Sequence, residues 1–172
     1  MRILVFGAGP LGSLIAARLQ EGGLAVTLLA RGQRLEELKE HGLVLKSWTS
    51  GVEEVHQIPL TDHLDTDDIY DLILVVMRKN SALKALPTLA ANRSKRILFL
   101  MNNAAGPQAL TEALGEERVL IGFAGMAGYR DGSRMVFLNA EEGRPGVIYL
   151  GEPGGGASAR LEETAAILGR GK

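Results

Sequence analysis

A glycine-rich turn near the start of the chain constrains its fold more than any other feature. The run Gly7-Ala8-Gly9-Pro10-Leu11-Gly12 follows residues 3–6, an apolar stretch typical of a buried parallel strand. Apolar residues then recur at helical spacing up to Gly22-Gly23, and residues 25–29 form a second apolar strand pattern. This strand–turn–helix–strand order predicts an α/β fold of the Rossmann type, with a doubly wound and mainly parallel sheet.

Each glycine of the turn suits a dinucleotide-binding loop. Gly7 permits the tight turn, Gly9 lets a pyrophosphate approach the backbone, and Gly12 lets the helix pack closely on the strand. The N–H groups at the start of the helix would then face the phosphates. A glycine-rich turn without a ligand is the alternative. We expect cofactor contacts from the whole loop: Gly7, Ala8, Gly9, Pro10, Leu11 and Gly12.

The end of the second strand indicates which dinucleotide is bound. An NAD site usually has an acidic residue there for the ribose 2′-hydroxyl, but this strand ends at Ala30-Arg31-Gly32. A guanidinium can bind a 2′-phosphate through a bidentate pair of hydrogen bonds, so the expected cofactor is NADP(H). Arg34 is a second candidate, and solvated surface charge is the alternative for both arginines.

Length and composition exclude several classes of protein. The 172 residues suffice for one domain, and the net charge of −1 argues against a nucleic-acid partner. The absence of cysteine excludes disulfides, thiolate zinc sites and cysteine nucleophiles. No run approaches the length of a membrane helix, and the first strand begins too early for a signal peptide. We therefore expect a cytoplasmic protein without a membrane partner.

Two further strands end in polar side chains. Residues 71–77 are strongly apolar and lead into Arg78, and residues 97–101 lead into Asn102. Ligands of open α/β sheets bind at the carboxyl ends of the strands, so both side chains are candidates for the cofactor site. The alternatives are that Arg78 opens the next helix on the surface and that Asn102 serves only a turn. In that next helix, Pro87 should produce a kink or a restart.

The later chain favours antiparallel structure. Residues 135–138 and 147–150 are expected to pair through a turn at residues 143–146, as an antiparallel β-ribbon appended near the C-terminus. Earlier, short strands on either side of Ser50-Gly51 either extend the main sheet or form a small hairpin. The acidic segment 61–68 is expected to be a solvated loop, with no metal site. Ser158 should cap a final helix.

Taken in order, these features resemble the N-terminal half of the ketopantoate reductases (2-dehydropantoate 2-reductases). The resemblance rests on the following segments: the glycine loop 7–12, Ala30-Arg31-Gly32, the strand 71–78, Met101-Asn102 and the turn Arg130-Asp131-Gly132. It implies that the loop and Arg31 form an NADPH site. It also implies that Arg78 replaces a cofactor-contacting lysine, that Asn102 contacts cofactor and substrate, and that the backbone at Gly128 passes the nicotinamide.

The sequence departs from the family after its asparagine, where Asn103-Ala104-Ala105 stands in place of Gly-x-Gly. The substrate edge of the pocket is therefore expected to differ. The resemblance further implies an all-helical second domain that supplies the general-acid lysine and most substrate contacts. Residues 1–172 are then expected to be the NADP(H)-binding domain alone, as a fragment or a truncated product, with no catalytic residue in this chain.

The function implied for the intact enzyme is reduction of 2-dehydropantoate, or a similar 2-keto acid, by hydride transfer from NADPH. One alternative is a non-catalytic NADP(H)-binding sensor or regulatory module. Another is the N-terminal domain of a different two-domain hydroxy acid dehydrogenase. A methyltransferase fits least, because it would need an acidic residue in place of Arg31. Apolar surface left by a missing domain makes a homo-oligomer a further hypothesis.

Overall fold

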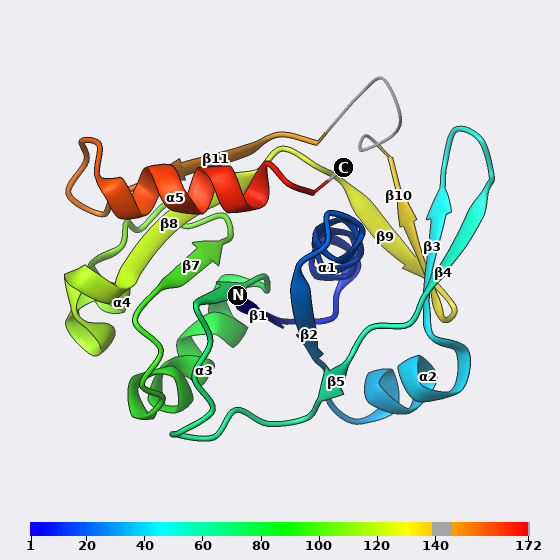
Figure 1. Cartoon of the computed structure of the whole chain (residues 1–172), viewed down its shortest axis with the longest axis horizontal. Helices are drawn as coiled ribbons and strands as arrows, with labels where there is room; N and C mark the ends of the chain where they lie inside the picture. Colours follow the sequence, from blue (N-terminus) through cyan, green and yellow to red (C-terminus); the bar gives the residue numbers. More distant parts are fainter. Residues whose placement is uncertain (139–145, 172) are drawn as a thin grey trace.

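The computed structural model describes residues 1–138 and 146–171, which form two β-sheets and their covering helices (Figure 1). The larger sheet has seven strands in the order β11-β8-β7-β6-β1-β2-β5. In chain order these strands are β1 (Arg2–Phe6), β2 (Ala25–Leu29), β5 (Leu60–Thr61), β6 (Leu72–Val75), β7 (Ile97–Leu100), β8 (Val119–Ala124) and β11 (Ile148–Gly151).

The order of the strands places a topological switch point beside β1. All neighbours in this sheet are parallel except β11, which is antiparallel to β8. The chain builds outward from β1 through β2, then crosses back and continues through β6, β7 and β8 on the other side. The direction of winding therefore reverses between β1 and β6, which is where doubly wound sheets bind ligands. The predicted Rossmann-type sheet is confirmed.

Helices cover both faces of the sheet, which explains why its strands are apolar throughout. Ile3 and Val5 of β1 belong to the same buried cluster as α1 (Pro10–Glu21), and α5 (Ala159–Leu168) packs against that cluster. Leu4 and Phe6 belong to the opposite cluster, with α3 (Lys79–Ala91) and α4 (Gln108–Leu114). The other helical segments are α2 (Gln33–His41) and the short 3₁₀ turn η1 (Glu116–Arg118). No helix among the described residues has the length and apolar character needed to cross a bilayer.

Two local predictions about the helices have different outcomes. Ser158 caps α5, and its hydroxyl oxygen accepts a hydrogen bond from the Leu161 N–H at 3.2 Å, as expected. Of the kink or restart expected at Pro87, the restart is wrong, because α3 is one continuous helix with this proline inside it. Ala82 and Leu89, on either side of the proline, are fully buried and hold both halves of the helix against the sheet.

The smaller sheet lies against the outer side of α1 (Figure 1). Its order is β4-β3-β10-β9, with β3 parallel to β10 and the other two pairs antiparallel. These strands are β3 (Leu43–Ser47), β4 (Glu53–His56), β9 (Gly128–Asp131) and β10 (Arg134–Phe137). Of the two possibilities for the strands beside Ser50-Gly51, the structure has the small hairpin, β3 with β4.

The predicted pairing within the C-terminal ribbon is wrong. Strand β10 pairs with β9 and β3 in the small sheet, whereas β11 pairs with β8 at the edge of the large sheet. The tight turn at Gly132-Ser133 gives β10 a closer partner, and Met135 and Phe137 are buried in the cluster that contains α1. Most of the predicted 143–146 turn lies outside the described residues.

Candidate functional site

The glycine loop connects β1 to α1 at the crevice, and two of its glycines are required by backbone packing. Gly7 has a φ of +128°, and a Cβ on it would lie 2.4 Å from the Val76 carbonyl oxygen. A Cβ on Gly12 would lie 1.9 Å from the Gly7 carbonyl oxygen. Neither position can hold a larger residue without moving the backbone, so these glycines fix how closely strand and helix approach each other.

Gly9 differs from its two neighbours in the loop. Its φ is −77°, which any residue adopts, and a Cβ on it would meet no atom within 4 Å. Gly9 is also the N-cap residue of α1, and no side chain caps this helix. Open space therefore stands in front of a helix N-terminus, the arrangement that accepts an anionic group. Neither backbone strain nor packing therefore requires a glycine at position 9.

Two cavities meet at the loop. The β2-side cavity, of about 520 Å³, lies between the end of β2 and helix α3. The β7-side cavity, of about 930 Å³, extends past the ends of β6 and β7 to strand β9. Both are lined by Gly7, Gly9 and Pro10, so together they make one cleft that passes over the glycine loop.

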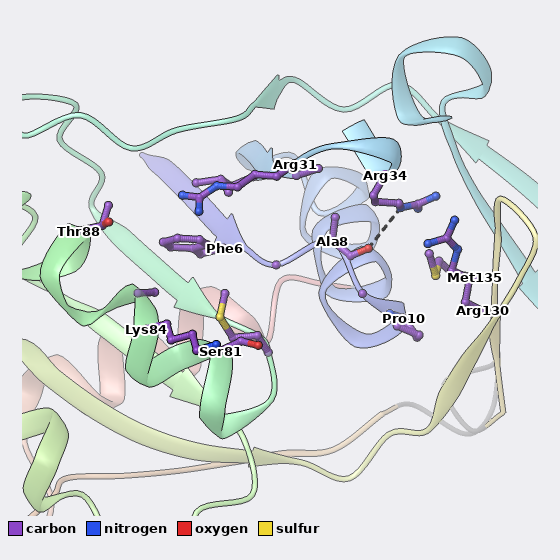
Figure 2. Close-up of a pocket in the computed structure, with 16 residues that line it drawn as sticks. Phe6, Ala8, Pro10, Arg31, Arg34, Ser81, Lys84, Thr88, Arg130 and Met135 are labelled. Atoms are coloured by element: carbon purple, nitrogen blue, oxygen red, sulfur yellow. Dashed lines mark hydrogen bonds between the residues drawn. The ribbon is translucent and has the colours of Figure 1, made fainter. Parts of the chain in front are cut away.

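The β2-side cavity is lined by four cationic side chains (Figure 2), and two of them, Arg34 and Arg130, form ion pairs with Glu37. Its charged lining residues are Arg31, Arg34, Lys84 and Arg130, and none of the described residues that line it is acidic. Arg31 is exposed; its Nε donates to the Asp62 carbonyl oxygen at 3.0 Å, and its guanidinium carbon lies 5.6 Å from the centre of the Phe6 ring. The structure thus places Arg31 where an anionic group on a nucleotide could reach it.

Arg34 is more deeply placed and bonds to several elements. Its Nε donates to the Ala8 carbonyl oxygen at 3.3 Å, and its Nη1 donates to the Ser133 carbonyl oxygen at 3.0 Å. Burial lowers the pKa of this guanidinium against the opposing effect of Glu37, and nearby Arg130 lowers it further. Nη2 of Arg34 is buried and has no hydrogen-bond partner among the described residues. Arg34 therefore retains an unused buried donor at the cavity.

The β7-side cavity brings together the other three predicted positions: Arg78, Asn102 and Gly128 all line it. Arg78 is exposed and is also the N-cap residue of α3, so it both opens the helix and borders the cavity. Asn102 is exposed just after β7. A Cβ on Gly128 would lie 2.6 Å from the Val136 carbonyl oxygen, so packing within the small sheet is sufficient to explain this glycine.

Several lining residues were not anticipated from the sequence. Ser81, Lys84 and Thr88 of α3 face the β2-side cavity (Figure 2). Their i, i+3, i+7 spacing is a polar stripe on one helix face, a signal that the sequence does contain. Arg130 carries no comparable signal, because it reaches the cavity only through the pairing of β9 in the small sheet.

The same fold occurs in dehydrogenases and reductases of known structure. D-mandelate dehydrogenase, solved with NADH and anilino(oxo)acetate, superposes with a TM-score of 0.85 at 22% identity, over 99% of this chain and 55% of that one. The 2-dehydropantoate 2-reductase from Geobacter metallireducens GS-15 superposes with a TM-score of 0.81 at 26% identity, over 99% of this chain and 56% of that one.

A match between the amino-acid sequence and a family model shows to which family the chain belongs. The family model described as "Ketopantoate reductase PanE/ApbA" matches residues 3–155, and the chain belongs to this family of oxidoreductases. The uncharacterized oxidoreductase YkpB of Bacillus subtilis (strain 168) is 31% identical over 124 residues, which cover 71% of this chain and 40% of that protein. The chain thus spans about half the length of the relatives it matches.

Proposed function

We propose that this chain binds NADP(H) in the cleft over the glycine loop. We also propose that residues 1–172 serve as the nucleotide-binding domain of an enzyme that reduces 2-dehydropantoate or a similar 2-keto acid. The observation that carries the proposal is Gly9, whose missing side chain leaves open space before the uncapped start of α1. A pyrophosphate placed there would lie against backbone N–H groups and the positive end of the helix.

The two cavities suit the two ends of such a cofactor. On the β2 side, Arg31, Arg34 and Lys84 offer positive charge to a ribose 2′-phosphate, and the described lining of this cavity holds no acidic residue that would repel it. On the β7 side, Asn102 can donate to and accept from a carboxamide or a ribose hydroxyl. Apolar side chains, among them Met77, Leu100 and Phe123, would limit the access of water to a ring bound between them.

When bound, the nicotinamide would supply the hydride for the keto carbon. In this proposal the chain binds and orients the cofactor: the loop holds the phosphates, and Arg78 and Asn102 border the reactive end. The proton for the keto oxygen would come from the helical domain that the family resemblance implies. We therefore expect this chain alone to bind NADPH without useful turnover.

A pair of glycine variants tests whether the nucleotide lies on the loop. Gly9 and Gly151 both have ordinary φ values and open space where a Cβ would lie. Calorimetry should show that Gly9→Ala weakens NADPH binding about tenfold or more, because the new methyl group occupies the ligand's position. Gly151→Ala should bind like the unmodified chain, and both variants should keep their melting temperature. Unchanged NADPH affinity in Gly9→Ala would refute the proposed position.

A further inference from the structure

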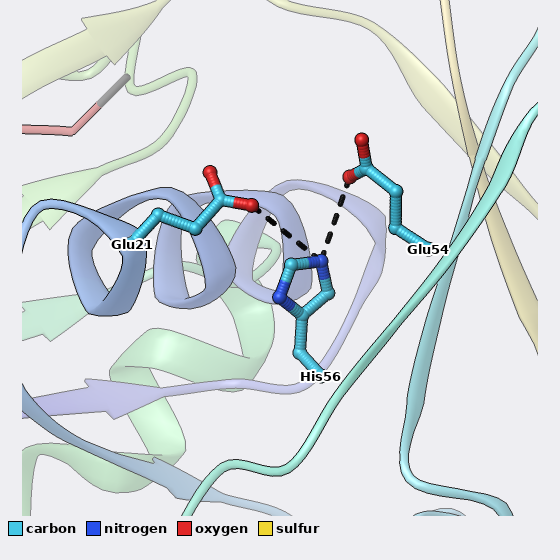
Figure 3. Close-up of side chains that lie close together, drawn as sticks. All are labelled: Glu21, Glu54 and His56. Atoms are coloured by element: carbon cyan, nitrogen blue, oxygen red, sulfur yellow. Dashed lines mark ion pairs between the residues drawn. The ribbon is translucent and has the colours of Figure 1, made fainter.

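Three side chains that could bind a metal lie together near the C-terminal end of α1, the end opposite to the glycine loop (Figure 3). Glu21 is the last residue of α1, and Glu54 and His56 come from β4. Alternation along the strand puts residues 54 and 56 on one face, and the packing of the small sheet against α1 brings that face to Glu21. His56 Nε2 lies 3.8 Å from Glu21 Oε1 and 3.5 Å from Glu54 Oε2.

The imidazole nitrogen has an unusual environment. Only 12% of the His56 side chain is exposed, and Nε2 itself is buried without a hydrogen-bond partner in the described part of the chain. Buried polar atoms normally have a partner, so this one calls for an explanation. His56 Nε2 faces two carboxylate oxygens, and a divalent cation between the three groups would give each of them a partner.

We propose that Glu21, Glu54 and His56 bind a divalent transition-metal ion of the Zn²⁺ type. One imidazole and two carboxylates suit Zn²⁺ or Co²⁺, whereas Ca²⁺ and Mg²⁺ prefer oxygen ligands alone. Tetrahedral bonds of about 2.0–2.2 Å put ligand atoms roughly 3.3–3.6 Å apart. The distances of 3.5 and 3.8 Å from His56 are close to that range. All three ligand atoms lie within 4.8 Å of one another, so rotation of an exposed glutamate can close the site.

The Arg18 guanidinium would compete with a metal ion for the two carboxylates of this site. Its Nη1 donates to Glu21 Oε1 at 2.9 Å and to Glu54 Oε2 at 2.9 Å, so the guanidinium neutralises both carboxylates. It also stacks over the Phe137 ring, at 5.6 Å from the ring centre. A metal ion must displace these hydrogen bonds and tolerate a nearby positive charge. Arg18 therefore sets the affinity of the site, and its removal should tighten metal binding.

The position of the site gives the metal a structural role. Glu21 ends the helix that starts at the glycine loop, whereas Glu54 and His56 belong to the hairpin β3–β4. A metal ion held by all three would tie the small sheet to α1. Because it would bind only the folded chain, saturating Zn²⁺ should raise the melting temperature.

The test is a calorimetric titration of the untagged chain with ZnCl₂. One equivalent should bind, and His56→Gln should weaken binding about tenfold or more by removing a ligand. His63→Gln is the matched control, because His63 is exposed and also faces two carboxylates, those of Asp62 and Asp65. It should leave the affinity unchanged. Arg18→Met should tighten binding about tenfold or more, a gain that a misfolded variant cannot produce.

Two results would overturn the site. The first is absence of Zn²⁺ binding by the unmodified chain. The second is equal affinity in the unmodified chain and His56→Gln, which would locate the metal elsewhere. Equal affinity in Arg18→Met would refute the competition between the Arg18 guanidinium and the metal ion for the two glutamates. None of these results depends on NADPH, so the metal site and the proposed cofactor site can each be refuted without the other.

Discussion

If the chain binds NADP(H) as proposed, replacing Arg31 by methionine should remove its preference for NADPH over NADH. Methionine keeps an unbranched stem over the Phe6 ring and removes only the charged group. Two unit charges about 4 Å apart interact by roughly 1 kcal/mol in water and about 4 kcal/mol near a protein surface. Arg31 is exposed, so we take the lower part of that range, about 1–2 kcal/mol.

That energy corresponds to a loss of roughly 5- to 30-fold in NADPH affinity, with NADH affinity unchanged. Calorimetry with both cofactors measures it, and raising the ionic strength should weaken NADPH binding more than NADH binding. Lys84→Met should shift the preference in the same direction, because its side chain lines the same cavity. Arg93→Met is the control: Arg93 is equally cationic but pairs with Asp67 in an exposed loop.

Equal weakening of NADPH and NADH binding in Arg31→Met would contradict the predicted phosphate contact. That result would mean that Arg31 supports the fold of the site rather than selecting a phosphate. Unchanged affinity for both cofactors would also contradict the contact, since Arg31 would then be a solvated surface charge. If Arg93→Met also loses the preference for NADPH over NADH, the preference comes from the electrostatic potential of the whole protein rather than from a local contact.

Three further predictions concern stability. Gly12→Ala should destabilise the chain by several kcal/mol or prevent folding, because its Cβ would lie 1.9 Å from a backbone oxygen; expression level and melting temperature report this. Ser158→Ala should cost about 1 kcal/mol in urea unfolding, because it removes the hydroxyl cap of α5. A hydrogen bond from Arg160 lowers the pKa of Glu152 in the folded chain. The associated stability is therefore complete above the ordinary glutamate pKa of about 4.3 and is lost as the pH falls through the lowered value. Urea unfolding at neutral and acidic pH should show a smaller acid-induced loss for Glu152→Gln than for the unmodified chain.

The elements that sequence predicts well are those whose signal is local. Strand β1 and the glycine loop, for example, follow from an apolar run and a turn that only glycine can make. The cap of α5 likewise depends on one hydroxyl and the next turn of the helix. The partner of β10 was not predictable in this way. Its burial against α1 and its pairing with β3, whose paired residues lie 90 positions earlier, are decided by tertiary packing.

The same distinction between local signals and tertiary packing applies to the residues of the candidate site. Arg31, Arg78 and Asn102 could be placed because each follows a predicted strand, and parallel strands end at a common edge. The position of Lys84 depends on which face of α3 is turned toward the cavity. The polar stripe identifies that face only when the orientation of the helix is known. The cluster of Glu21 with His56 could not be predicted at all, because it depends on how the small sheet packs against α1.

The most direct test of the account is the amide NMR spectrum of the ¹⁵N-labelled chain during titration with NADPH. We predict saturable shifts of the Gly7, Gly9, Gly12 and Gly128 signals, because these residues line the cleft. Signals of β4, the edge strand of the small sheet opposite to β9, should not shift. If the loop signals do not move at saturating NADPH, or if the shifts are confined to β4, the proposed cofactor site is wrong.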